Sequence, residues 1–346
     1  MTVTATISTK DRYFTTLPLA IQAICTQTVT PNKFVLFDDG EHRDLRGVSP
    51  YTHLFRLLDT KKIGWEVVFG NRTGQVTNHQ LALDRADTDF IWRLDDDNVP
   101  EPTCLEHLLG VMRDQPTCGA VGGLVIDPSS VGPRPSFLTS KIEDILCPFN
   151  LQWYDWRGAP EIVDHLYSTF LYRVEAGRKA GGYCRELSPV GHREETMFSH
   201  AIQRAGYKLV VEPQARTWHM REGSGGIRSY NDGSLWAHDE AVFLRKLGEW
   251  GVKLTEFKFV VLDNGIGDHI VFKSILPKIL AKNSGARTVV ACCYPEVFKG
   301  VDGITLVSIA DAKAAFKNLD QWNVYKWCAE RDWKRPLAEA FEGMYL

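Results

Sequence analysis

The chain of 346 residues lacks several features that mark particular classes of protein. It has no apolar run of about 18 residues, so no membrane-spanning helix is expected. None of its eight cysteines forms a CxxC pair, which argues against a zinc cluster or a disulfide framework and fits a reducing cytoplasm. The first residues show no basic end followed by an apolar core, so no secretory signal is expected. A net charge of −3 gives no bulk attraction to nucleic acid or acidic membranes.

What the first half of the sequence does contain is an alternation of apolar strands and amphipathic helices. Strands are expected at 3–9, 33–40, 65–71, 88–97 and 118–127, and helices at 15–27 and 74–86. This alternation is typical of βαβ units around a mostly parallel sheet, which is an α/β fold. In such sheets ligands bind at the carboxyl ends of the strands.

Two of the predicted strands end in carboxylates at that edge. One ends in Asp38 and Asp39, and the other in Asp95, Asp96 and Asp97. Adjacent carboxylates repel one another unless a positive charge lies nearby, and Mg²⁺ or Mn²⁺ bound by carboxylates would supply it. A solvated Asp-rich turn is the structural alternative. The buried strand before the three acids favours the metal site.

Three residues further along the chain are candidates for chemistry. Glu194 and Glu195 begin a predicted helix, where the helix dipole stabilises a carboxylate and where one of them could act as a general base. His219 follows a strand and could be a nitrogen ligand for Mn²⁺, although a lone histidine is more often structural.

Three stretches in order resemble family 2 glycosyltransferases of the GT-A fold, over about residues 1–225. They are "ISTKDRYFTTLPLAIQAICTQTVTPNKFVLFDDG", "NRTGQVTNHQLALDRADTDFIWRLDDDNVPEP" and "GHREETMFSHAIQRAGYKLVVEPQARTWH". The resemblance implies a GT-A, Rossmann-like sheet, and an enzyme that transfers a sugar from a nucleotide diphospho-sugar to an acceptor hydroxyl. It also implies a Mn²⁺ or Mg²⁺ cofactor and inversion at the anomeric carbon.

The resemblance also implies roles for particular residues. The residues expected at the nucleotide sugar are Thr9, Arg12, Asp38, Asp39, Arg72, Asn78, Asp95 and Asp96. Those expected at the metal are Asp97, Asp95 and His219. Of the three adjacent acids, Asp96 is expected to point away and to tolerate substitution best. The chain has Glu194–Glu195 where the family usually has Glu–Asp, which leaves the identity of the base open between them.

The rest of the chain is expected to form a linker with a connecting helix at 226–255 and a small α/β domain at 256–346. The segment "FKFVVLDNGIGDH" resembles the start of heptosyltransferase-like GT-B enzymes, of which only about 90 residues are present. We expect no activity from this part alone. A role in acceptor binding or in forming a homo-oligomer is the hypothesis.

The expected donor is a nucleotide diphospho-sugar, with UDP-sugars first among them. The acceptor is left open between a saccharide, a lipid-linked glycan, a protein and a modified nucleic acid. Trp153 and Trp156 could stack on a sugar or lie in a core. A non-catalytic sugar-nucleotide binder is one alternative. A nucleotidyltransferase is another, although "STKDRYFTT" lacks the glycine-rich loop that class needs.

Overall fold

The structure is a computed structural model that describes residues 1–128, 141–142, 158–226, 233–254, 257–316 and 318–346. Trp153 and Trp156 lie outside the described residues. The chain divides into two compact units, one formed mainly by Met1–Val131 and Gln152–Val252 and the other mainly by Lys253–Leu346. Among the helices in the described part, none is long and apolar enough to cross a membrane.

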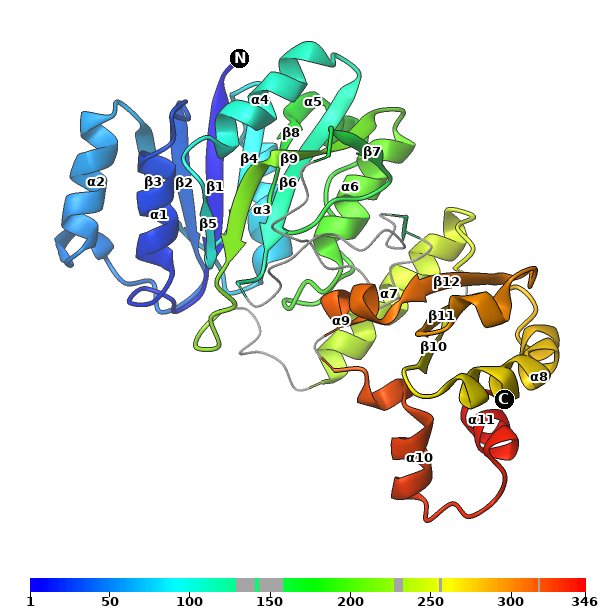
Figure 1. Cartoon of the computed structure of the whole chain (residues 1–346). Coiled ribbons are helices and arrows are strands. Elements are labelled where there is room, and N and C mark those ends of the chain that lie inside the picture. Colours follow the sequence, from blue (N-terminus) through cyan, green and yellow to red (C-terminus); the bar gives the residue numbers. More distant parts are fainter. Residues whose placement is uncertain (129–140, 143–157, 227–232, 255–256, 317) are drawn as a thin grey trace. The chain divides into compact units, whose positions relative to one another are not determined.

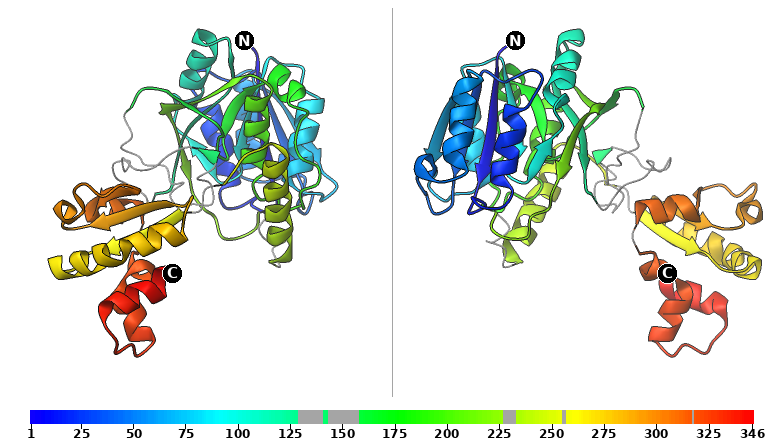
Figure 2. Two further views of the ribbon diagram at one scale, coloured as in Figure 1. Left: turned by 90° about the vertical axis from the view of Figure 1, so that its right-hand side faces the viewer. Right: turned by 60° about the vertical axis from the view of Figure 1, so that its left-hand side comes forward.

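The first unit is built on a mixed sheet with helices on both faces (Figures 1 and 2). Its strands are β1 (Val3–Thr9), β2 (Lys33–Asp38), β3 (Gly64–Phe69), β4 (Phe90–Asp95), β5 (Asn98–Pro100), β6 (Cys118–Ile126), β7 (Glu161–Val163), β8 (Phe170–Arg173) and β9 (Lys208–His219). Its helices are α1 (Leu17–Cys25), α2 (Tyr51–Thr60), α3 (Gln75–Asp84), α4 (Cys104–Asp114), α5 (Val174–Lys179), α6 (Glu194–Arg204) and α7 (Ser234–Glu249).

The strand order is β3-β2-β1-β4-β8-β6-β9-β5, with β7 beside β9. The β1–β2, β1–β4, β2–β3 and β6–β9 pairs are parallel, and the pairs made by β5, β7 and β8 are antiparallel. This arrangement confirms the predicted α/β fold with a mostly parallel sheet. Gly206, at φ 96°, follows the end of α6 as its sequence position predicted.

The main core lies between the sheet and α1, α2 and α4. Alternate side chains of β1 and β4, including Ile7 and Trp92, point into it and are fully buried. Burial of such large side chains stabilises the fold by roughly 1.5–3 kcal/mol each. The opposite face of the sheet carries Arg93 beneath α3 and α6.

The second unit has a parallel sheet of three strands, in the order β10-β11-β12. Its elements are β10 (Phe257–Leu262), α8 (Ile266–Lys282), β11 (Arg287–Cys292), β12 (Ile304–Ser308), α9 (Ile309–Ala315), α10 (Val324–Glu330) and α11 (Leu337–Tyr345). Helices α8 and α11 cover one face through Phe272 and Phe341. The strand–helix order from Phe257 is the one expected from the sequence. Its likeness to GT-B enzymes stays a prediction.

Candidate active site

Polar side chains gather at the carboxyl ends of β1, β2 and β4. Thr9 at the end of β1 is in register with Asp38 on β2, and Ser8 is in register with Asp95 on β4. Parallel pairing therefore brings the two acidic strand ends to one edge of the sheet, as the sequence predicted.

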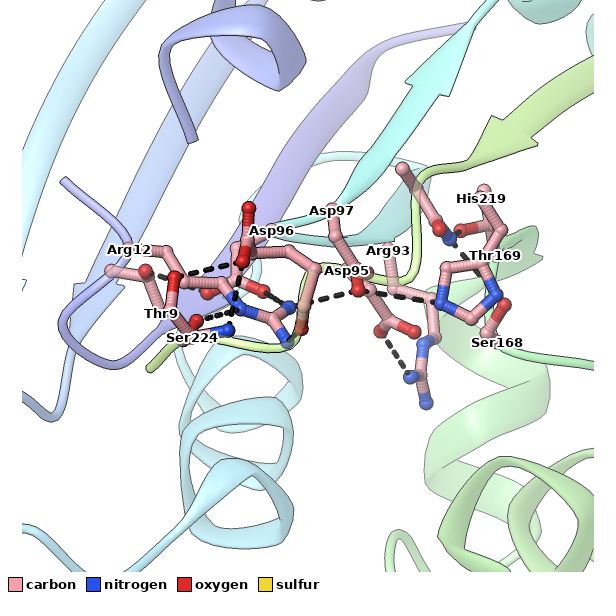
Figure 3. A network of polar contacts seen from close by, with 12 residues as sticks. Thr9, Arg12, Arg93, Asp95, Asp96, Asp97, Ser168, Thr169, His219 and Ser224 are labelled. Atoms are coloured by element: carbon pink, nitrogen blue, oxygen red, sulfur yellow. Dashed lines mark hydrogen bonds and ion pairs between the residues drawn. The ribbon is translucent and has the colours of Figure 1, made fainter. Parts of the chain in front are cut away.

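Arg12 supplies a positive charge to two of the three adjacent acids, Asp96 and Asp97 (Figure 3). Its Nη1 lies 2.6 Å from Asp96 Oδ1 and 2.9 Å from Asp97 Oδ2. Burial opposes the charge of Arg12, but Asp96 and Asp97 outweigh it and raise the pKa of the guanidinium above its ordinary value. Arg12 therefore lies across the acidic turn, and its expected contact with a nucleotide stays a prediction.

The same guanidinium fastens a glycine-rich segment to the site. Arg12 donates through Nη2 to the carbonyl of Glu222 at 2.7 Å and through Nε to that of Ser224 at 3.3 Å. The amide of Gly226 donates to the carbonyl of Lys10 at 2.6 Å. The segment from Gly223 to Gly226 therefore lies against the acidic edge. Residues 227–232 lie outside the described part.

Asp96 does not point away from the site, so the expectation that it does is wrong. It is 5% exposed, and its Oδ2 accepts a hydrogen bond of 2.8 Å from the Thr9 hydroxyl. Burial raises the pKa of its carboxyl to about 6, against the opposing attraction of Arg12. Asp96 is therefore part of the buried support of the acidic turn.

We expect Asp96→Asn to remove a pH dependence of stability. The carboxyl has a pKa of about 6 when folded against an ordinary 3.8. Between these values the unfolded chain loses the proton first, so the wild-type free energy of unfolding falls as pH rises. A shift of about two units corresponds to about 3 kcal/mol. Urea denaturation from pH 4 to pH 7 should show the variant gaining about this much relative to wild type, and parallel curves would contradict the assignment.

The carboxylates of Asp38 and Asp39 both accept hydrogen bonds from neighbouring groups of the protein. Asp38 is fully buried, and both its oxygens accept from the Tyr13 hydroxyl, at 2.7 and 2.9 Å. Asp39 is 1% exposed and accepts backbone N–H bonds from Arg72 at 2.9 Å and Gly74 at 2.6 Å. In this structure both carboxylates shape the edge of the site. Contact of either with a nucleotide stays a prediction.

The remaining residues expected at the nucleotide flank this edge. Arg72 is exposed at φ 59°, and its Nε donates to the carbonyl of Gly40 at 3.1 Å. Asn78 is buried on α3 and donates to the Ser8 hydroxyl at 2.8 Å. Arg72 is thus the exposed cation of the set, and Asn78 joins α3 to β1.

Asp97 and His219 converge from β4 and β9. Asp97 Oδ2 lies 3.4 Å from His219 Nε2. Asn98 pairs in register with His219, and its buried amide donates to the hydroxyls of Ser168 and Thr169, which fixes the turn after Asp97. One carboxylate and one imidazole suit Mn²⁺, with phosphate oxygens and water completing the shell. No group of three or more His, Cys, Asp or Glu suited to a metal occurs among the described residues.

The structure separates the two glutamates of α6. Glu194 is 1% exposed and forms a two-point ion pair with Arg93, at 2.8 Å to Oε2 and 2.7 Å to Oε1. Burial raises the pKa of Glu194, while the charge of Glu194 outweighs burial at Arg93 and keeps the pKa of Arg93 well above its ordinary value. Glu195 is half-buried and forms no hydrogen bond or ion pair with the residues described.

Glu195 is also close to the acidic edge. Burial raises the pKa of Asp95, and the charges of Asp97 and Glu195 add to the rise, while Arg93 at 3.3 Å opposes it. A carboxylate beside this edge has the character of a general base when no described residue bonds its oxygens, as is the case for Glu195. Glu194 instead pairs with Arg93 and so stabilises the packing of α6 on the sheet.

Sequence reasoning missed Arg93. It is a charged residue in the middle of the apolar strand "FIWRLD" and is 1% exposed. A charge buried in a strand requires a partner of opposite sign, so the pattern itself carried the signal. The partner could not be identified, because Glu194 lies about a hundred residues away.

Comparison with known proteins agrees with this geometry. Residues 4–162 match the family described as Glycosyl transferase family 2. The structure resembles that of GalNAc-T7 with UDP, GalNAc and Mn²⁺, at 18% identity, covering 65% of this chain and 45% of that one, with a TM-score of 0.50. It also resembles S. aureus TarS 1-349 in complex with UDP-GlcNAc, at 12% identity, covering 71% and 67%, with a TM-score of 0.52. No curated sequence matches the chain significantly.

Residues 4–162 of the first unit are thus similar to family 2 glycosyltransferases, and the fold is that of GT-A glycosyltransferases, as the sequence motifs predicted. At these identities the solved structures establish the fold. The chain spans less than half the length of the GalNAc-T7 chain that it resembles.

Proposed function

We propose that this chain transfers a sugar from a nucleotide diphospho-sugar to an acceptor hydroxyl, with inversion at the anomeric carbon. One observation carries the proposal: Glu195, which bonds none of the described residues, lies close to the sheet edge where Asp97 and His219 converge at 3.4 Å. A glycosyl transfer site requires a base for the acceptor and a binding site for the leaving diphosphate, and this edge offers both.

The proposed residues divide the reaction between them. Glu195 accepts the proton of the acceptor hydroxyl, whose oxygen forms a bond to the anomeric carbon as the bond to the diphosphate breaks. Asp97 and His219 would hold a divalent cation, which neutralises charge on the leaving diphosphate when bound. The Gly223–Gly226 segment is positioned to exclude water from this edge. The two similar structures contain UDP or a UDP-sugar, which supports UDP-sugars as the first donors to test.

The test is turnover of a panel of UDP-, GDP- and dTDP-sugars, each with Mn²⁺, with Mg²⁺ and with EDTA. We expect at least one UDP-sugar to be consumed, with activity lost in EDTA. Asp97→Asn is expected to lower turnover by about 100-fold. Asp114→Asn, at an exposed carboxylate paired only with its neighbour Arg113, is the control and should keep wild-type activity.

Two results would contradict the proposal in different ways. Donor binding without turnover for every sugar would favour a non-catalytic sugar-nucleotide binder. Turnover that persists in EDTA and in Asp97→Asn would remove the metal from the proposed mechanism.

A further inference from the structure

The start of α6, which carries Glu195, has no side-chain capping bond from its N-cap residue, and the amide of Glu194 donates to the carbonyl of Gly191 at 3.2 Å. The N-cap residue, Arg193, adopts a left-handed backbone, at φ 69°. Gly191 two residues earlier is also left-handed, at φ 64°. A left-handed conformation is unfavourable for a non-glycine residue, so neighbouring structure must maintain it.

Helix α7 stabilises this backbone conformation through a buried carboxylate. Asp239 is fully buried and accepts three hydrogen bonds from the turn before α6. The donors are the amide of Ser188 at 2.6 Å, its hydroxyl at 2.9 Å, and the amide of His192 at 2.8 Å. All three donors lie within seven residues of Glu195 in sequence. One side chain of α7 thereby fixes the backbone that leads into the base.

The next residue of α7 adds a second set of contacts. Glu240 accepts from His192 Nε2 at 3.0 Å and from Arg193 Nε at 3.1 Å. The guanidinium of Arg193 also lies over the ring of Phe243, 5.4 Å from its centroid. The left-handed residue at the start of α6 is thus held by α7 on one side. Arg93 holds Glu194 from the sheet on the other.

We propose that Asp239 is a positioning residue for the reaction, one that orients Glu195 by fixing the Ser188–His192 turn. The inference rests on the proposed function. It changes the interpretation of α7, which was expected to be only a connecting helix between domains. Asp239, Val242, Phe243 and Leu247 are all buried, so the acid lies on the apolar face of the helix. A carboxylate among the apolar positions of an amphipathic helix indicates a buried polar contact, and the sequence of α7 shows this pattern at Asp239.

The test compares Asp239→Asn with wild type on the donor that wild type consumes. We expect kcat to fall by about 10–100-fold, because a displacement of the base by about 1 Å is enough for such a loss. The KM for the donor should stay within about two-fold of wild type, since the hydrogen bonds of Asp239 to the described residues go to Ser188 and His192. Hydrogen–deuterium exchange without ligand should become faster at residues 188–197.

Gln27→Ala is the matched control. Gln27 is 3% exposed and bonds Leu105, Ala23 and Glu101, so its loss also removes buried hydrogen bonds from the first unit. It should lower thermal stability without slowing kcat or changing exchange at 188–197. Ser188→Ala keeps the amide bonds to Asp239 and removes the hydroxyl bond to it, together with the bond that this hydroxyl accepts from the Val190 amide. This milder variant is expected to lower kcat less, at the same KM, and is measured whether or not Asp239→Asn folds.

The outcomes separate the two proposals. If wild type turns over a donor and both Asp239→Asn and Ser188→Ala keep its kcat, the positioning role is overturned and the proposed function stands. Unchanged exchange at 188–197 in both variants overturns the positioning role without any assay of activity. If wild type consumes no donor, the proposed function fails, and the positioning role fails with it.

Discussion

Replacing Glu195 with glutamine is expected to lower kcat by about 10²–10⁴-fold, the range for loss of a general base. Glutamine keeps the size of the side chain but cannot take the acceptor proton. Because Glu195 is half-buried and bonded to no described residue, the variant should unfold at nearly the wild-type temperature. The measurement is steady-state transfer with the donor identified in the panel, beside a thermal melt of each protein.

Two further variants distinguish the glutamates. Glu195→Asp keeps a carboxylate of the type usual in the resembled family and should retain more activity than the glutamine variant. Glu194→Gln removes the charge that pairs with Arg93, so its main expected effect is on stability. If Glu194→Gln folds normally and loses activity while Glu195→Gln keeps it, the base is Glu194.

Replacing Arg93 with methionine is expected to have the largest effect on stability. The side chain is 1% exposed and lies between Glu194 and Asp95, so its removal leaves a buried carboxylate without a counter-charge. Breaking a buried ion pair from one side costs about 3–5 kcal/mol. The measurement is the free energy of unfolding of wild type and variant, obtained from thermal or urea unfolding followed by circular dichroism.

The double variant Arg93→Met with Glu194→Leu tests the cause. Replacing both partners of a buried pair with apolar residues is often neutral or stabilising, so the double variant should recover much of the loss. Arg113→Met, at an exposed pair with Asp114, is the control and should change stability by about 1 kcal/mol or less. A double variant no more stable than Arg93→Met alone would show that Arg93 acts through packing.

Both predictions concern one physical problem, the concentration of carboxylates at one edge of a sheet. Two arginines from distant parts of the first unit neutralise it: Arg12 faces Asp96 and Asp97, and Arg93 faces Asp95 and Glu194. The sequence led us to expect a metal ion as the counter-charge for the three aspartates. In this structure the protein itself contributes much of it. Asp97 and His219 remain the pair that would hold a cation.

The sequence by itself was sufficient to predict the sheet and the edge at which its acidic strand ends meet. A parallel strand that ends in acids must present them at the carboxyl edge, because strand direction and pairing follow from local pattern and crossover geometry. The register of Thr9 with Asp38 and of Ser8 with Asp95 is the result. The match of residues 4–162 to family 2 glycosyltransferases agrees with the motifs quoted for it.

Only the tertiary structure decided how the charges pair. Glu194 and Glu195 are adjacent in one helical turn, about 100° apart around the axis, and the docking of α6 determines which one meets Arg93. The hydrogen bond from the Ser188 amide to Asp239 joins residues that are 51 positions apart in the sequence. Arg12 reaches Glu222 across 210 positions. Local patterns carry no information on such contacts, since they depend on how helices pack on the sheet.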